Sequence, residues 1–220
     1  MDNEVFKALY QYSSPEISDA LDACGINGYL STIKPIGNSK KLVGPAYTLQ
    51  YQLLNEPPKQ FMQASHYIDD VPTGAVVFIH NEGNLSCSVW GAILTHFAHH
   101  KKIAGTVVYG AVRDVHLHEK YDYPVYACGV TPRTGKNRVR LVSKRESLKI
   151  EGVTINFNDI VFADSTGTLI IPNNQVSKIL TMVQNIAHNE SNIIKAIDAG
   201  KSLKEAREAH HYDKPWEKDN

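Results

Sequence analysis

The spacing of apolar and polar residues changes between two periods along the first part of the chain. Apolar runs typical of buried strands alternate with segments in which apolar residues recur every three or four positions, as in a helix. Ser14 and Pro15 are the expected N-cap and first residue of the first helix, which Gly25 ends. We expect strands at 42–51, 75–81, 103–110 and 123–130, and helices at 14–24, 57–71 and 86–101.

In the second half of the chain, a run of short strands and then two helices replaces the regular alternation of strands and helices. A short helix or turn at 112–121 is followed by a basic stretch, 131–145, that is typical of a solvated hairpin. Short strands are then expected at 140–144, 153–157, 159–164 and 167–172, and helices at 175–199 and 202–211. The pattern predicts one α/β or α+β domain over residues 1–220, in which residues 175–220 form a helical C-terminal arm. Arms of this kind commonly pack on a neighbouring subunit, which we expect here although periodicity alone does not show it.

Composition excludes several classes of protein. Of 220 residues, 42% are hydrophobic, and 23 basic residues balance 23 acidic ones, so no nucleic-acid partner is indicated. No apolar run approaches the length of a membrane helix and no signal peptide is visible, so no membrane partner is expected either. Three widely spaced cysteines, Cys24, Cys87 and Cys128, are typical of reduced thiols in a cytoplasmic protein.

The charged pair Arg113–Asp114 directly follows the apolar run GTVVYGAV. The end of a buried strand is where α/β folds place ligand sites. An arginine there can hold a carboxylate through two hydrogen bonds, and an aspartate can supply an oxygen to Mg²⁺. The residue types alone favour a surface ion pair or an aspartate at a helix N-terminus over a ligand site.

Three other stretches contain residues that could bind a metal ion, an anion or RNA. His96, His99 and His100, and the pair His116–His118, have spacings that zinc accepts, but no third ligand lies at a signature distance. The loop at 81–86 leads into a helix and can present free N–H groups, although a plain turn at Gly83 explains it equally well. The basic stretch 131–145 lacks the interleaved aromatic residues that RNA binding needs.

Several segments together resemble one family. They are ISDALDACG, LVGPAYTLQ, VPTGAVVFIHNEG, VWGAIL, GTVVYGAVRDV, YPVYACGVTPRTGK and FADSTGTLIIP, followed by the C-terminal helix that carries Glu190. The chain resembles, over residues 14–205, the class II pyruvate aldolases that act on 4-hydroxy-4-methyl-2-oxoglutarate, and their RraA-like relatives named as regulators of ribonuclease activity. The joint pattern is specific, whereas no single segment is.

The resemblance implies a swivelling β/β/α domain that assembles as a homotrimer or a hexamer, with active sites between subunits. It implies that the backbone N–H groups of Gly91, Ala92, Ile93 and Leu94 bind the carboxylate of a small 2-oxo acid. Arg113 would contact the keto acid and Asp114 would bind Mg²⁺ or Mn²⁺. Glu190, from a neighbour's C-terminal helix, would join through water molecules of the metal.

The implied reaction is retro-aldol cleavage of a 4-hydroxy-2-oxo acid to pyruvate, with oxaloacetate decarboxylation through the same enolate. Arg113 and a divalent cation would stabilise the charge that develops on the keto oxygen. Two departures keep an alternative open, a non-catalytic regulator that binds a protein partner. The aldolases usually carry an acid at the position of Ala92 and an aspartate at that of Tyr109, whereas Asp114 is retained here.

Overall fold

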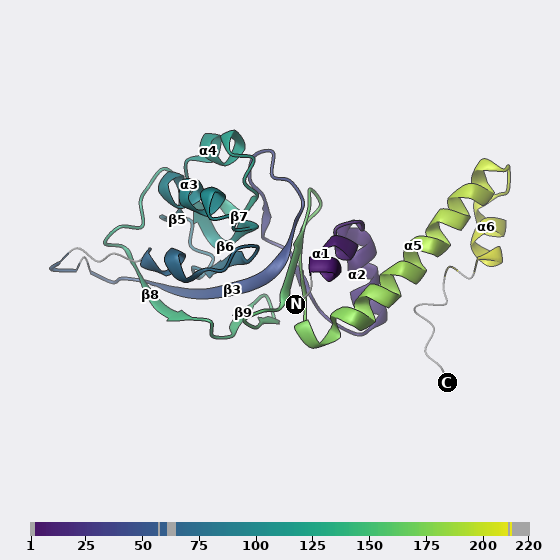
Figure 1. Cartoon of the computed structure of the whole chain (residues 1–220), viewed down its shortest axis with the longest axis horizontal. Helices are drawn as coiled ribbons and strands as arrows, with labels where there is room; N and C mark the ends of the chain where they lie inside the picture. The colour runs from purple at the N-terminus through teal and green to yellow at the C-terminus, as the bar shows by residue number, and fades with distance from the viewer. Residues whose placement is uncertain (1–2, 57, 61–64, 211, 213–220) are drawn as a thin grey trace.

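The computed structural model describes residues 3–56, 58–60, 65–210 and 212 (Figure 1). Its strands are β1 (Tyr29–Leu30), β2 (Lys34–Pro35), β3 (Leu42–Leu53), β4 (Val76–His80), β5 (Ser88–Trp90), β6 (Gly105–Val112), β7 (Val125–Val130), β8 (Val139–Lys144), β9 (Leu148–Ile150), β10 (Val153–Ile155), β11 (Ile160–Ala163) and β12 (Thr168–Ile171). Its helices are α1 (Asn3–Leu9), α2 (Ser14–Ala23), α3 (Ala92–His100), α4 (Val115–Lys120), α5 (Val176–Asp198) and α6 (Leu203–Ala209), with short 3₁₀ turns at His66–Asp70 and Asn173–Gln175.

A curled sheet of ten strands organises the chain (Figure 1). Its path is β1-β12-β11-β3-β4-β6-β7-β2, with β5 paired to β6 and β8 paired to β3. The centre is parallel, from β3 through β4 and β6 to β7, and β5 is also parallel to β6. Parallel strands need a crossover connection, and α3 forms the one between β5 and β6. The mixed α/β fold class predicted from the sequence is confirmed.

The long strand β3 joins the two halves of the molecule. Its first residues pair antiparallel with β11, and the residues that follow pair parallel with β4. β11 and β12 carry an apolar face against α1, α2 and α5, built around Ile17, Leu21, Phe162 and Ile179, which are all buried. The α3 and α4 side therefore lies away from the α2 and α5 side (Figure 1).

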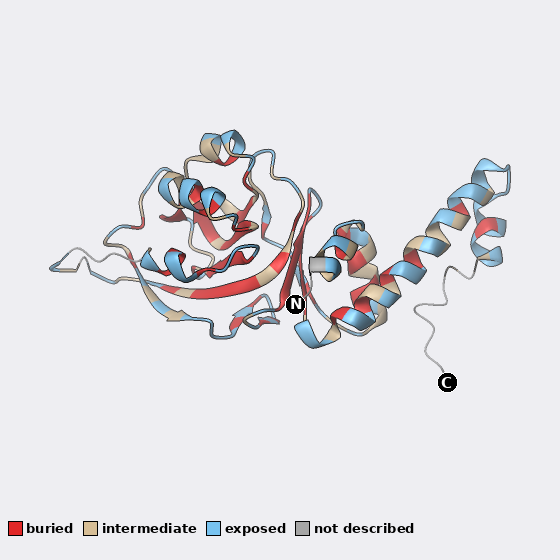
Figure 2. Cartoon of the chain, viewed as in Figure 1, coloured by how far each residue is buried: buried red, intermediate tan, exposed pale blue. Residues whose placement is uncertain are grey.

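Helix α5 forms the predicted arm. Its N-terminal half packs on α2 through Ile179, Val183 and Ile186, and its C-terminal half extends beyond the body of the molecule, where α6 folds back on it (Figure 1). There Ile194 and Ile197 stay 59% and 41% exposed (Figure 2). Whether a neighbouring subunit covers this face remains a prediction. Within the described ranges, no helix combines the length and apolar character needed to cross a bilayer.

Four sequence expectations need correction. Ser13 is the N-cap of α2, with Ser14 inside the helix. The helix expected at 57–71 is a 3₁₀ turn at His66–Asp70 in its described part, and the remainder lies partly outside the described residues. The helix expected from Ser86 begins only at Ala92, because β5 occupies residues 88–90. The basic stretch is not a hairpin, since β8 pairs with β3 instead of β7.

Asp164 anchors the start of α2. Its carboxylate accepts hydrogen bonds from the backbone N–H and the hydroxyl of Ser14, each at 2.7 Å, and from the N–H of Thr166 at 2.9 Å. Burial alone would raise the pKa of Asp164, but these bonds lower it. Asp164 therefore stabilises the fold in its charged form, above the pKa of an unfolded aspartate.

Substituting Asp164→Ala should lower the free energy of unfolding by about 2 kcal/mol at pH 7, because Ser14 loses a charged acceptor. The loss should shrink as the pH falls below about 4, where the wild-type carboxylate becomes protonated. Urea titration at several pH values measures both effects. Asp198→Ala, at an exposed position of α5, is the control and should change stability by less than about 0.5 kcal/mol. An equal loss in both variants would contradict the anchor.

His118, on α4, is buried rather than solvated. It is 2% exposed, and neither ring nitrogen has a hydrogen-bond partner within the described chain. Burial lowers its pKa to about 4, although the nearby Asp114 acts in the opposite direction. The folded chain therefore holds a neutral imidazole at a pH where the unfolded chain binds a proton.

Stability of the wild-type chain should fall as the pH drops from about 6.5 towards 4, by at most about 3 kcal/mol through His118. His118→Leu should remove most of this slope, because leucine fills the site without titrating. His100→Gln, at an exposed position of α3, should leave the slope unchanged. Urea titrations from pH 4.5 to 7.5 measure it, and an unaltered slope in His118→Leu would assign the acid sensitivity elsewhere.

Candidate functional site

Strand β6 ends at Val112, and the next two residues turn the chain away from the sheet. The backbone N–H of Arg113 donates to the carbonyl oxygen of Trp90 at 3.0 Å, which joins this turn to the end of β5. Asp114 then adopts a left-handed conformation, with φ of 59° and ψ of 42°. Aspartate and asparagine tolerate that region better than most residues. The turn therefore presents both charged side chains at the carboxyl edge of the parallel strands.

Gly91 allows the corner between β5 and α3 to approach this turn. A β-carbon at Gly91 would lie 2.7 Å from Oδ2 of Asp114 and 3.0 Å from Cγ of Arg113. Both distances are too short for a methyl group, so any larger residue would displace the charged pair. Gly83 forms the expected turn, with a positive φ.

The carboxylate of Asp114 connects the two segments. Its Oδ2 accepts the backbone N–H of Ala92 at 2.8 Å and lies 3.5 Å from Nε of Arg113. This places a negative charge at the N-terminus of α3, where the helix dipole favours it. In the part of the chain that the structure describes, Oδ1 makes no hydrogen bond. One oxygen of Asp114 is thus held in place and the other is available to a ligand.

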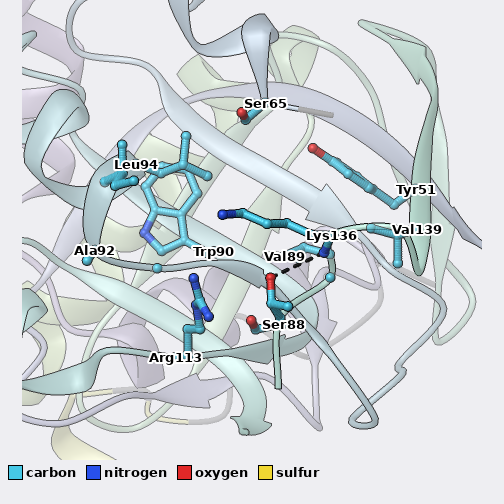
Figure 3. Close-up of a pocket in the computed structure, with 14 residues that line it drawn as sticks. Tyr51, Ser65, Ser88, Val89, Trp90, Ala92, Leu94, Arg113, Lys136 and Val139 are labelled. Carbon is cyan, nitrogen blue, oxygen red and sulfur yellow. Dashed lines mark hydrogen bonds between the residues drawn. The ribbon is translucent and has the colours of Figure 1, made fainter. Parts of the chain in front are cut away.

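A cavity of about 400 Å³ opens beside the turn (Figure 3). The four predicted substrate-binding residues, Gly91 to Leu94, line it together with Arg113. Gly91 is the N-cap of α3, and the first N–H groups of a helix have no acceptor within it. The structure therefore brings the predicted backbone donors and the predicted arginine to one cavity, at whose edge Asp114 lies.

The cavity combines apolar walls with positive charge. Trp90 forms part of one wall; its Nε1 donates to the hydroxyl of Thr95 at 2.9 Å, and its ring stacks on Tyr123 with centroids 6.1 Å apart. Two cationic side chains, Arg113 and Lys136, point into the space from different sides (Figure 3). Among the described residues, no aspartate or glutamate lines it. A cavity of this kind suits a small anion with an apolar portion.

Lys136 and Tyr51 are cavity residues that the sequence patterns do not identify. Lys136 lies in the basic stretch 131–145, whose scattered charges gave no reason to select one lysine. The one local signal is the preceding Gly135, because glycine permits a close backbone approach. Tyr109, considered as a pocket residue from the sequence, instead packs beside Gly83 and His80.

The proposed metal ligand Glu190 is not among the residues that line this cavity. It lies on α5, with Glu16 and Asp19 of α2 close by. Partial burial and the charges of these neighbours raise the pKa of Glu190, and burial together with Asp22 raises that of Asp19. Helix α5, which carries Glu190, lies on the other side of the molecule from α3 and α4 (Figure 1).

The described residues of one chain contain no cluster of three acidic, histidine or cysteine side chains that could hold a metal ion. Mg²⁺ does not require one, because it is often held by one or two carboxylates and keeps several waters. The unpaired Oδ1 of Asp114 is an oxygen donor of the correct hard type. Asp114 therefore fits a hydrated Mg²⁺ or Mn²⁺ as a single carboxylate ligand.

The chain is similar to several known proteins, both in sequence and in structure. Protein DlpA of Legionella pneumophila is 45% identical over 212 residues, which are 96% of this chain and 34% of DlpA, so the chain spans about a third of that relative. A Halalkalibacterium halodurans protein, named provisionally as a 4-hydroxy-4-methyl-2-oxoglutarate aldolase, is 29% identical over 74% of each chain. A solved structure of an uncharacterised Pseudomonas syringae protein aligns with a TM-score of 0.85 and 33% identity, covering 94% of this chain and 98% of that one.

The family comparison covers the sheet and the site together. Residues 14–170 match the RraA-like family, described as Aldolase/RraA, and this span contains the β5–α3 corner, the Arg113–Asp114 turn and Lys136. The curled sheet with its C-terminal helix also agrees with the solved Pseudomonas syringae structure. This chain belongs to the RraA-like family of aldolases and RraA proteins.

Proposed function

We propose that the protein is a divalent-metal-dependent lyase that cleaves a 4-hydroxy-2-oxo acid to pyruvate. The observation that carries this proposal is that the N-terminus of α3 and Arg113 line one cavity, while Asp114 contacts both of them through Oδ2 and makes no hydrogen bond through Oδ1 among the described residues. Relatives named as aldolases support the same reaction class. Oxaloacetate decarboxylation is a second expected activity, because it passes through the same pyruvate enolate.

The substrate's 1-carboxylate would bind at the start of α3. The backbone N–H groups there point along the helix axis and the helix dipole adds positive potential. Because Asp114 already accepts the N–H of Ala92, the donors left for substrate are those of the residues that follow, Ile93 and Leu94. Arg113 would then donate to the keto oxygen from the adjacent wall of the cavity.

Cleavage breaks the bond between C3 and C4 and moves its electron pair towards the keto oxygen. Arg113, held by its backbone bond to Trp90, would stabilise the negative charge as it forms. When bound beside Asp114, a divalent cation supplies Lewis-acid polarisation of the same oxygen. No described residue that lines the cavity is an acid or a histidine, so we assign removal of the 4-hydroxyl proton to water.

We further propose that Glu190 completes the site of a neighbouring subunit in a homotrimer or hexamer. Burial, followed by the charges of neighbouring carboxylates, raises the pKa values of Glu190 and Asp19, so a positive charge brought beside them would be stabilising. The exposed face of α3 supports assembly beside the cavity, since Ile93 is 81% exposed and Phe97 is 37% exposed. Covering this apolar surface would bring another chain next to Asp114.

Purified protein should release pyruvate from 4-hydroxy-4-methyl-2-oxoglutarate when Mg²⁺ or Mn²⁺ is present, and chelator should abolish the release. Asp114→Asn should lose at least 100-fold in kcat/KM, because the metal loses its charged ligand. Asparagine tolerates the left-handed conformation and retains an oxygen for the N–H of Ala92, so the thermal midpoint should change by less than about 3 °C. A coupled lactate dehydrogenase assay measures pyruvate.

Two further variants accompany this measurement. Arg113→Lys is a second test of the site, and Asp198→Asn is the control. The lysine keeps one positive charge without the planar guanidinium and should lose activity, whereas Asp198→Asn on the arm should behave as wild type. Absence of metal-dependent turnover of both 4-hydroxy-4-methyl-2-oxoglutarate and oxaloacetate by a correctly assembled oligomer would reject the lyase. The remaining candidate is then a regulator that binds a protein, which Ala92 favours because the aldolases usually carry an acid at that position.

Mixing two inactive variants tests whether Glu190 acts across subunits. Asp114→Asn and Glu190→Gln should each be inactive as pure oligomers, but subunit exchange between them should restore part of the activity. Restoration is expected because a mixed oligomer contains sites in which an intact Asp114 faces an intact Glu190. If the mixtures stay inactive although native mass spectrometry confirms exchange, Glu190 does not contribute across the interface.

A further inference from the structure

Hydrogen bonds attach the loop that carries Lys136 to β5, a strand that lines the cavity. Both the backbone N–H and the hydroxyl of Ser88, on β5, donate to the carbonyl oxygen of Arg133, at 2.9 and 3.0 Å. Ser88 and Thr134 also form a parallel β-bridge. The loop is therefore attached to the strand that leads directly into Gly91 and α3.

Further hydrogen bonds close the loop on itself around Lys136. Its backbone N–H donates to the hydroxyl of Thr134 at 3.2 Å, and Nη1 of Arg138 donates to the carbonyl oxygens of Thr134 and Lys136 at 3.1 and 3.3 Å. The N–H groups of Arg138 and Val139 both donate to the carbonyl oxygen of Gly135. The position of the Lys136 backbone is thus set by several independent contacts.

Gly135 determines how closely the loop approaches the strand. A β-carbon at this buried residue would lie 2.5 Å from the carbonyl oxygen of Ser88. That atom is backbone of β5, which is held in place by its pairing with β6, so glycine is the residue that permits this packing. The close approach places Lys136, which stays exposed to solvent, along the cavity (Figure 3).

The ammonium group of Lys136 has no acidic partner within the described residues. The ion pairs of the chain involve other lysines, and no carboxylate lines the cavity. Arg138, its nearest cationic neighbour in sequence, donates to backbone oxygens, which leaves Lys136 and Arg113 as the two cationic side chains that line the cavity. They enter the cavity from different sides (Figure 3).

We infer that Lys136 is a specificity residue that selects 2-oxo acids carrying a second carboxylate at the end remote from the keto group. This inference rests on the proposed function, in which Arg113 and the start of α3 hold the 2-oxo acid end. A lysine is a flexible point charge and suits the distal carboxylate of substrates that differ in length. The apolar wall formed by Trp90 and Leu94 would accommodate the carbon chain between the two charged ends.

Two substrates that differ by a single carboxylate test this role. 4-Hydroxy-4-methyl-2-oxoglutarate has the distal carboxylate, and 4-hydroxy-2-oxopentanoate has the same carbon chain without it. Lys136→Met should lower kcat/KM for the first substrate at least tenfold, mainly through KM, and change the second by less than twofold. Lys136→Arg should recover most of the loss, because it restores the charge. Lys149→Met, at an exposed position of β9, should match the wild type with both substrates.

Ligand binding without turnover separates this inference from the proposed reaction. In thermal-shift titrations, 2-oxoglutarate should stabilise wild type more than 2-oxobutyrate does, and Lys136→Met should abolish that preference. If wild type turns over neither substrate, the lyase is rejected and the titrations alone decide the role of Lys136. An unchanged preference in Lys136→Met, or an equal loss with both members of each ligand pair, would overturn the inference.

Discussion

The site depends on one close contact, between the corner at Gly91 and the turn at Arg113–Asp114. The contact requires a glycine on one side and a left-handed aspartate on the other. In return, the carboxylate of Asp114 accepts the first N–H of α3 and is held by the neighbouring guanidinium. The ends of two adjacent parallel strands are thereby joined, and this is why backbone donors, an arginine and a carboxylate oxygen share one small region.

The distribution of charge gives the molecule two complementary parts. The cavity is lined by Arg113 and Lys136 without an acid, whereas Glu16, Asp19 and Glu190 lie close together between α2 and α5. Arg113 is partly balanced by Asp114, whereas Lys136 has no acidic partner among the described residues. In the assembly that we propose, the carboxylates of one chain would face the cationic cavity of the next.

The exposed fractions of the apolar residues around α3 show where the helical pattern led to a wrong prediction. Leu85, Val89, Ile93 and Phe97 recur every four residues and indicate one buried helical stripe, yet only Val89 is buried, and it lies in β5. The other three remain partly exposed in the single chain. A periodic apolar pattern shows that a face will be covered, but it does not distinguish the chain's own core from another subunit. His118 is the opposite case, a polar residue buried without a partner.

The sequence by itself determined the fold class, the strand β6 with its following charged pair, and the turn at Gly83. These follow from local apolar runs and from backbone conformations that few residues adopt. Only the tertiary structure decided which parts of the chain meet. The pairing of β8 with β3, and the bonds from Ser88 to residue 133, bring Lys136 to a cavity that begins over 40 residues earlier in the chain. Such long-range contacts depend on how the sheet curls, and no local pattern of residues encodes them.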